Sequence, residues 1–143
     1  MGTYNTMLVA IDLSEEAAQV VERGVSLAKA QGCAVHIIHV IEPLSFAYGG
    51  DIPMDFSGVQ EEIQRQAEVQ LAKLGAQYGI DKDRQHLVLG RPATEIHALA
   101  EELAVDLIVV GSHGRHGFAL LLGSTANGVL HGAKCDVLAV RVG

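Results

Sequence analysis

The chain has 143 residues, is 49% hydrophobic and contains only three prolines, so we expect one globular domain over residues 1–143 and exclude a disordered or collagen-like chain. Acidic residues outnumber basic ones 17 to 10, and the formal net charge of −7 argues against nucleic acid as a partner. No apolar run is long enough to span a membrane and residues 1–5 do not resemble a signal peptide, which predicts a cytoplasmic protein with no membrane partner.

The first part of the chain alternates between aliphatic runs and segments with helical spacing. Thr6–Ile11 predicts a strand, and the small or apolar residues that follow Ser14 predict a helix that Gly32 ends. Ala34–Ile41 repeats the strand pattern. The next segment, Glu42–Gly58, carries two prolines and a Gly-Gly pair, which predicts a long loop.

The middle of the chain continues the alternation. Apolar residues spaced by three or four over Val59–Tyr78 predict an amphipathic helix that ends near Gly79. His86–Leu89 predicts a short strand, Pro92 lies in the turn after it, and the spacing over Ile96–Leu103 predicts another helix.

The last part of the chain contains its most aliphatic run and its most glycine-rich segment. Leu107–Val110 predicts a strand that is buried on both faces. Gly111–Gly117 holds three glycines, Thr125–His131 predicts a short helix, and Val137–Val142 predicts a final strand.

This order of elements predicts an α/β fold: a single doubly wound, five-stranded parallel sheet in the order 3-2-1-4-5, with helices on both faces. In that order the first and fourth strands are neighbours whose following helices lie on opposite faces, which opens a crevice at their carboxyl ends. The segments Ile11–Ser14 and Gly111–Gly117 would both reach this crevice. We therefore expect a ligand to bind there.

The glycine-rich segment has the residue types of a phosphate site. Glycines allow backbone N–H groups to approach an anion, and a helix that begins after them adds unpaired N–H donors and the positive end of its dipole. An arginine in the segment could contact a terminal phosphate, and two hydroxyls could donate hydrogen bonds. The candidate residues are Gly111, Gly114, Arg115, Gly123, Ser124 and Thr125. The spacing matches neither a Walker A loop nor a Rossmann motif.

Six motifs spread over nearly the whole chain resemble one known family. They are VAIDLS, HVI, LGRPATEI, DLIVVGSHGRHG, LLLGSTA and CDVLAVRV. Together these motifs are similar to those of the universal stress protein family. The resemblance implies a dimeric stress-response regulator that binds ATP or another adenine nucleotide, with Mg²⁺ or Mn²⁺ as the accompanying ion and with little or no turnover.

The same resemblance implies roles for individual residues. Asp12 would bind ribose or help to hold a phosphate-bound metal ion, and Val40 would lie beside the adenine. Ala10 and Ile11 occupy the positions next to Asp12. The family's phosphate motif is matched in residue types by Gly111, Gly114, Gly123 and Ser124. The residues themselves leave another role open for Asp12, because an Asp at this place also caps helices.

Two other functions remain open at this point. Eight residues separate Gly114 from Gly123, one fewer than in the family's motif, and this spacing resembles the branch around universal stress protein A. That branch suggests a nucleotide-free dimeric interaction module that uses its surface and the loop around Phe46–Phe56. The third function is a slow ATPase or self-phosphorylating enzyme with a phosphate acceptor among Ser112, Ser124 and Thr125. The sequence alone assigns no catalytic residue.

The last strand, the cysteines and two of the histidines give weaker signals. Val137–Val142 would be an apolar edge strand, which predicts a homodimer through this strand. Cys33 and Cys135 would begin strands far apart in the sheet, so we expect two free thiols. His36 and His39 would face opposite sides of one strand, and we expect no metal site between them.

Overall fold

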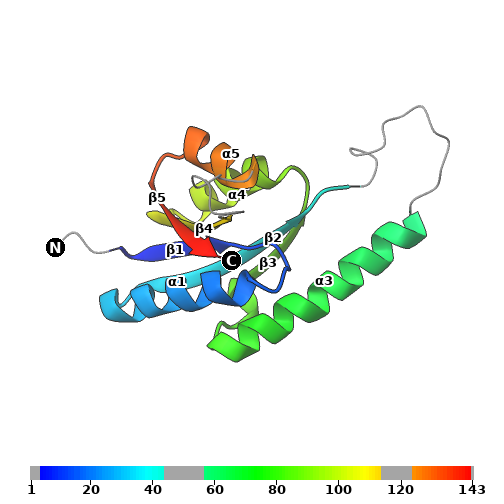
Figure 1. The fold of residues 1–143 in the computed structure, drawn as a ribbon, viewed down its shortest axis with the longest axis horizontal. Helices are drawn as coiled ribbons and strands as arrows, with labels where there is room; N and C mark the ends of the chain where they lie inside the picture. Colours follow the sequence, from blue (N-terminus) through cyan, green and yellow to red (C-terminus); the bar gives the residue numbers. More distant parts are fainter. Residues whose placement is uncertain (1–3, 44–56, 114–123, 143) are drawn as a thin grey trace.

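A parallel sheet of five strands forms the centre of the molecule in the computed structural model, which describes residues 4–43, 57–113 and 124–142. The strands are β1 (Thr6–Ala10), β2 (Ala34–Ile41), β3 (Gln85–Leu89), β4 (Leu107–His113) and β5 (Asp136–Val142). Their order is β3-β2-β1-β4-β5, and each neighbouring pair is parallel. The predicted fold class and strand order are confirmed (Figure 1).

The helices cover both faces of the sheet. They are α1 (Ala17–Gln31), α3 (Ser57–Tyr78), α4 (Pro92–Glu102) and α5 (Ser124–Gly132). Figure 1 shows α1 and α3 on one face and α4 and α5 on the other, with one end of α3 extending beyond the sheet.

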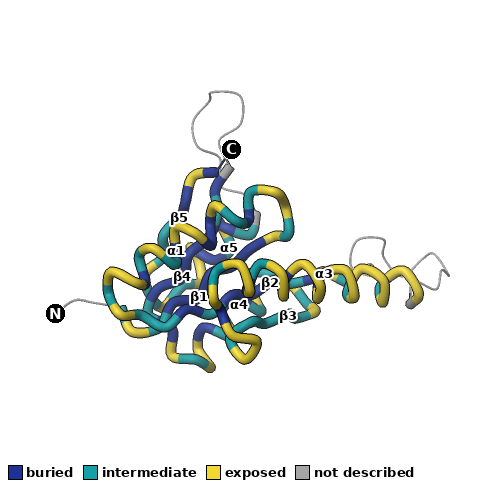
Figure 2. Tube along the Cα trace, turned by 90° about the horizontal axis from the view of Figure 1, so that it is seen from below, coloured by how far each residue is buried: buried dark blue, intermediate teal, exposed yellow. Residues whose placement is uncertain are grey.

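Each face of the sheet has its own apolar core, because successive residues of a strand point to opposite sides. On the α1 side, Met7 and Val9 of β1 pack with Val21 of α1. On the α4 and α5 side, Leu8 of β1 packs with Ile108 of β4. All five side chains are at most 1% exposed. Figure 2 shows the buried residues concentrated along the central strands and the exposed ones along α3.

The helix ends agree with the predicted glycine signals. Gly32 follows α1 with a φ of 66°, and Gly79 follows α3 with a φ of 69°. Glycine adopts this left-handed conformation without the steric cost that a Cβ brings, and it therefore ends both helices at the expected places. Pro92 does not lie in the preceding turn as predicted but begins α4, since proline lacks only an N–H that the first helical turn leaves unpaired.

Two other predicted boundaries need correction, and one short element was not predicted. The helix that follows Ser14 begins only at Ala17, after a turn in which the Ala17 N–H donates to the Ser14 carbonyl oxygen at 3.1 Å. Helix α3 begins at Ser57, so Ser57 and Gly58 are helical and not part of the predicted loop Glu42–Gly58, of which residues 44–56, including Phe46–Phe56, lie outside the described residues. A short 3-10 turn at Lys82–Arg84 precedes β3 and was not predicted.

The largest difference from the sequence prediction lies in β4. The aliphatic run ends at Val110, but the strand continues to His113 because residues 111–113 pair with Val140, Arg141 and Val142 of β5. Gly111 is therefore a strand residue and not the first residue of a loop. Pairing with a neighbouring strand has outweighed the low strand propensity of Gly and Ser. None of the helices in the described ranges has the length and apolarity needed to cross a membrane.

Candidate functional site

A cleft lies where the carboxyl ends of β1, β2 and β4 meet the helices on both faces. Its volume is about 230 Å³. The lining residues are Ala10, Ile11, Asp12, Glu16, Ala17, Val20, Ile38, His39, Val40, Pro92, Ile96, Val110, Gly111, Thr125, Ala126 and Val142. We call this space the strand-end cleft. It is located at the predicted switch point of the sheet, where open α/β sheets bind their ligands.

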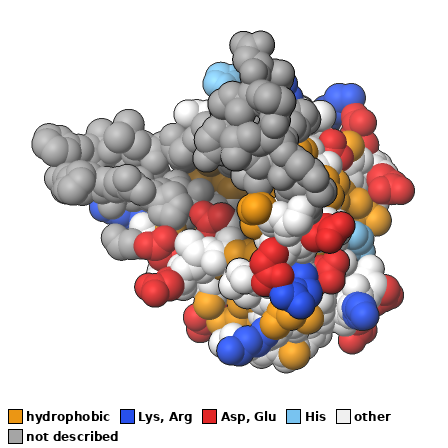
Figure 3. Space-filling model, turned by 90° about the vertical axis from the view of Figure 1, so that its right-hand side faces the viewer, with side chains coloured by type: hydrophobic (Ala, Val, Ile, Leu, Met, Phe, Trp, Pro, Cys, Tyr) orange, Lys and Arg blue, Asp and Glu red, His pale blue; other side chains and the backbone are white. Residues whose placement is uncertain are grey.

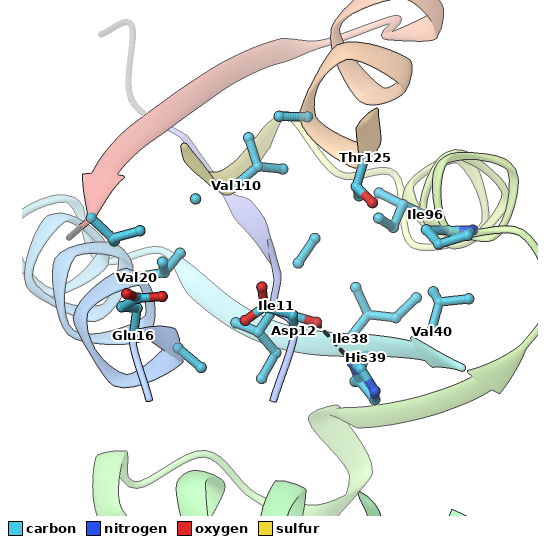
Figure 4. Close-up of a pocket in the computed structure, with 16 residues that line it drawn as sticks. Ile11, Asp12, Glu16, Val20, Ile38, His39, Val40, Ile96, Val110 and Thr125 are labelled. Carbon is cyan, nitrogen blue, oxygen red and sulfur yellow. Dashed lines mark hydrogen bonds between the residues drawn. The ribbon is translucent and has the colours of Figure 1, made fainter. Parts of the chain in front are cut away.

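The walls of the strand-end cleft differ in character. Ile38, Val40 and Ile96 form an apolar wall from β2 and α4, and Thr125 adds a hydroxyl group from the first turn of α5. Glu16 and Val20 come from the opposite side, at the beginning of α1 (Figure 4). The aliphatic wall therefore lies on the β2 and α4 side of the cleft, and the Glu16 carboxylate lies on the α1 side.

Asp12 is exposed at the carboxyl end of β1 and is held in a tight turn. Its Oδ1 accepts hydrogen bonds from the Ser14 backbone N–H at 3.2 Å and from the Ser14 Oγ at 2.5 Å. This is an Asx-type turn, in which a side-chain oxygen replaces a backbone acceptor. Helix α1 begins at Ala17, beyond the turn, so Asp12 does not have the helix-capping role that the sequence left open. The turn instead fixes the carboxylate at the edge of the cleft.

His39 is a residue of the site that the sequence analysis did not select. Its Nδ1 donates to the Ile11 carbonyl oxygen at 2.9 Å, since a carbonyl can only accept (Figure 4). The Ile11 N–H in turn donates to the Ile38 carbonyl oxygen at 3.0 Å. These two bonds hold Ile11, the first residue after β1, against β2. The motif HVI includes His39 and places it near the end of the second strand. Its hydrogen-bond partner, however, depends on the strand register, which the motif does not give.

Six of the predicted site residues meet along the strand-end cleft: Ala10, Ile11, Asp12, Val40, Gly111 and Thr125. A Cβ built on Gly111 would lie 3.0 Å from the Val20 methyl carbon, so a larger residue there would press on α1. Predicted residues Gly114, Arg115 and Gly123 lie outside the described residues, and Ser124 is described only as the first residue of α5.

The charge around the strand-end cleft is acidic. The carboxylates of Asp12 and Glu16 line it, and none of its described lining residues is Lys or Arg. Figure 3, which views the molecule from the right-hand side of Figure 1, shows acidic side chains on that face among hydrophobic ones and some Lys and Arg. An anionic ligand in this part of the site would therefore benefit from a divalent cation between its phosphates and the carboxylates.

One of the three proposed phosphate acceptors is inaccessible. Ser112 has 0% exposure, and its hydroxyl donates to the Val140 carbonyl oxygen at 3.5 Å in the β4–β5 ladder. A hydroxyl that is buried between strands cannot reach a nucleotide in solution. The structure therefore excludes Ser112 from the group of accessible hydroxyls.

The histidines of β2 have different partners, as the strand alternation predicts. His39 bonds to β1, whereas His36 Nδ1 lies 3.0 Å from His86 Nε2 on β3. Burial is the main cause that lowers the pKa of both His36 and His86 from the usual 6.5. Both rings are therefore neutral near pH 7, and one nitrogen of the pair donates to the other.

This histidine pair gives the folded state a pH dependence of known sign. Because the folded-state pKa values lie below 6.5, the unfolded chain takes up protons first as the pH falls, and stability is lost from about pH 6.5 downward. We expect the unfolding midpoint to fall more between pH 7.5 and pH 5.5 in the wild type than in the double variant His36→Gln/His86→Gln. Equal falls in the two proteins, measured by circular dichroism, would contradict this account.

Both cysteines are free, as predicted. Burial raises the pKa of the Cys33 thiol and of the Cys135 thiol. A raised pKa reduces the thiolate fraction, so neither side chain is an activated nucleophile. Cysteine chemistry is therefore not part of the candidate site.

Comparison with known proteins identifies the family to which the chain is similar. Residues 3–141 match the universal stress protein family. The chain is 41% identical to universal stress protein A homolog 1 of Coxiella burnetii over 139 residues, which cover 96% of each chain. Among solved structures, a universal stress protein in complex with cAMP matches with a TM-score of 0.61 and 26% identity over 98% of both chains.

A second solved structure has the same fold in a longer chain. It is a putative universal stress protein from Pseudomonas aeruginosa, with a TM-score of 0.72 and 24% identity over 97% of this chain. The match covers 48% of that chain, so our chain spans about half of its length. The sequence motifs, the strand order and these relatives agree, and the chain belongs to the universal stress protein family.

Proposed function

We propose that this chain is a stress-response regulator of the cytoplasm that binds ATP or another adenine nucleotide in the strand-end cleft and acts through binding, with little or no turnover. The observation that carries the proposal is the convergence of Ala10, Asp12, Val40, Gly111 and Thr125 on one cleft at the switch point of the sheet. A universal stress protein of the same fold is described in complex with cAMP, which supports an adenine nucleotide as the ligand.

The size and character of the cleft suit part of a nucleotide. Sites that enclose a whole small molecule usually measure about 300–1,000 Å³, so a cleft of about 230 Å³ accommodates a base and sugar and leaves the phosphates outside. The base would pack against Val40 and Ile96, and the ribose hydroxyls would lie near Asp12. Gly114, Arg115, Gly123 and Ser124 remain the proposed phosphate residues. Mg²⁺ or Mn²⁺ would neutralise phosphates near the carboxylates.

Removing the charge of Asp12 should weaken nucleotide binding. In Asp12→Asn the amide oxygen can still accept from Ser14, so the turn is retained while the carboxylate is lost. We expect the dissociation constant for ATP with Mg²⁺ to rise at least about tenfold, since a hydrogen bond to a charged group contributes about 1.5–3 kcal/mol. Glu15→Gln, which removes an exposed charge outside the cleft lining, serves as the control. Equal constants for Asp12→Asn and the wild type would remove Asp12 from the site.

Identifying any ligand that co-purifies with the protein distinguishes nucleotide binding from a nucleotide-free role. We expect mass spectrometry of the denatured protein to detect an adenine nucleotide, and millimolar ATP with Mg²⁺ to raise the unfolding midpoint of the emptied protein. If no nucleotide is released and ATP does not move the midpoint, the nucleotide-free interaction module becomes the better interpretation. Release of phosphate from labelled ATP would instead favour the third function, a slow ATPase.

We also propose a homodimer through the outer edge of β5. This strand ends the sheet, so one row of its backbone N–H and C=O groups has no neighbouring strand among the described residues. Pairing with a second β5 would satisfy that row. Sedimentation at micromolar concentration should give twice the mass of one chain. A single-chain mass at these concentrations would refute the dimer.

A further inference from the structure

A pair of histidines lies on the sheet away from the strand-end cleft. His36 of β2 and His86 of β3 each lie two residues before Ile38 and Val88, which pack into the core under α4 and α5, so both rings are on that face. Their ring centroids are 5.2 Å apart with an angle of 26° between the planes, and both side chains are half-buried. Neither residue lines the cleft.

The separation of the two nitrogens is the informative quantity. His36 Nδ1 and His86 Nε2 are 3.0 Å apart. Two imidazole nitrogens bound to one ion at about 2.0 Å, at right angles to each other, are about 2.8 Å apart. The two rings therefore already have the spacing of neighbouring ligands in a square or octahedral coordination shell.

The surroundings of the pair favour a cation. Asp83, before β3, and Glu102, at the end of α4, act electrostatically on His86, and each raises its pKa, which shows that negative charge lies nearby. Arg84 opposes this effect at His36, but its guanidinium forms an ion pair with Asp81 at 2.9 Å. Burial keeps both rings neutral near pH 7, so each offers a nitrogen lone pair.

We propose that His36 and His86 together bind one late first-row divalent ion, with Cu²⁺ bound most tightly and Zn²⁺ more weakly. The order follows from the general preference of imidazole sites for these ions. In the described part of the chain no group of three His, Cys, Asp or Glu side chains can hold a metal ion, so water completes the shell and the ion exchanges readily. Both facing nitrogens must be unprotonated in the complex. The remaining hydrogens then sit on His36 Nε2 and His86 Nδ1, and no net proton is released at neutral pH.

The test uses the full chain, purified without a histidine tag and titrated with Cu²⁺ at pH 7.4. Electron spin echo spectroscopy counts the imidazoles bound to Cu²⁺. We expect two in the wild type and one in His36→Gln and in His86→Gln, with binding at least about tenfold weaker in each variant. His131→Gln removes an exposed histidine at the end of α5 and should match the wild type.

A second measurement addresses variants that fold poorly. Zn²⁺ that binds the folded state raises the unfolding midpoint, and we expect this rise in the wild type and in His131→Gln but not in the two pair variants. A wild-type spectrum with fewer than two imidazoles would overturn the proposal. So would a two-imidazole signal, or a full Zn²⁺ shift, that survives in His36→Gln or His86→Gln.

Discussion

Replacing Val40 by Trp is expected to weaken binding of ATP with Mg²⁺ by at least about 100-fold, or about 2.8 kcal/mol. Val40 lies in the apolar wall of the strand-end cleft, at the carboxyl end of β2. An indole at this position would occupy much of a cavity of about 230 Å³ and exclude the base. Equilibrium dialysis with labelled ATP measures the two dissociation constants directly.

The register of the sheet supplies a matched control for this variant. Val88 of β3 pairs with Val40 of β2, is also half-buried, and does not line the cleft. Val88→Trp therefore adds the same ring one strand away from the ligand. We expect its dissociation constant for ATP to lie within about threefold of the wild-type value, because substitutions away from a ligand have small effects on its binding. If both variants bind as well as the wild type, the base does not occupy this cleft.

Leu8→Ala is expected to have the largest effect on stability. Leu8 is in the central strand β1, has 0% exposure, and packs with Ile38 and Ile108 under α4 and α5. Such a substitution removes buried methyl groups and leaves a cavity between rigid strands, which costs about 2–5 kcal/mol. The free energy of unfolding of a typical domain is only about 5–15 kcal/mol, so this loss is severe. The thermal unfolding midpoint should fall by about 10 °C.

Val69→Ala is the control for the stability prediction. Val69 is 64% exposed on α3, so truncating it removes little buried surface. Chemical denaturation should place this variant within about 0.5 kcal/mol of the wild type. A Leu8→Ala protein as stable as Val69→Ala would mean that β1 is not the packed centre of the sheet.

The sequence was sufficient to predict the fold because its pattern is locally consistent. Strand runs such as Thr6–Ala10 and Ala34–Ile41 are rich in aliphatic residues, and glycines such as Gly32 end the helices. The prediction was wrong at β4, where Gly111 and Ser112 extend the strand through their pairing with Val140 and Arg141. That pairing joins residues 29 positions apart and leaves no signal in the local pattern.

The candidate site could be predicted only in part. Asp12 was predicted from its position after the first strand, because strand order alone brings the ends of the first and fourth strands together. Val40 was predicted only from the resemblance to the family. Glu16 and Ile96 were missed because they depend on which side of α1 and α4 is turned toward the cleft. His39 was missed because its hydrogen bond to Ile11 depends on the register between β1 and β2. Helix rotation and strand register are both set by packing.

The most direct test of the central claim is an NMR titration of the isotope-labelled chain with ATP and Mg²⁺. We predict that the largest amide shift changes will occur at Ile11, Asp12, Val40 and Ala126, which come from the segment after β1, from β2 and from α5 and all line the strand-end cleft. The changes should saturate with a single dissociation constant. Unchanged spectra at millimolar ATP, or changes confined to residues remote from these four, would contradict the proposed nucleotide site.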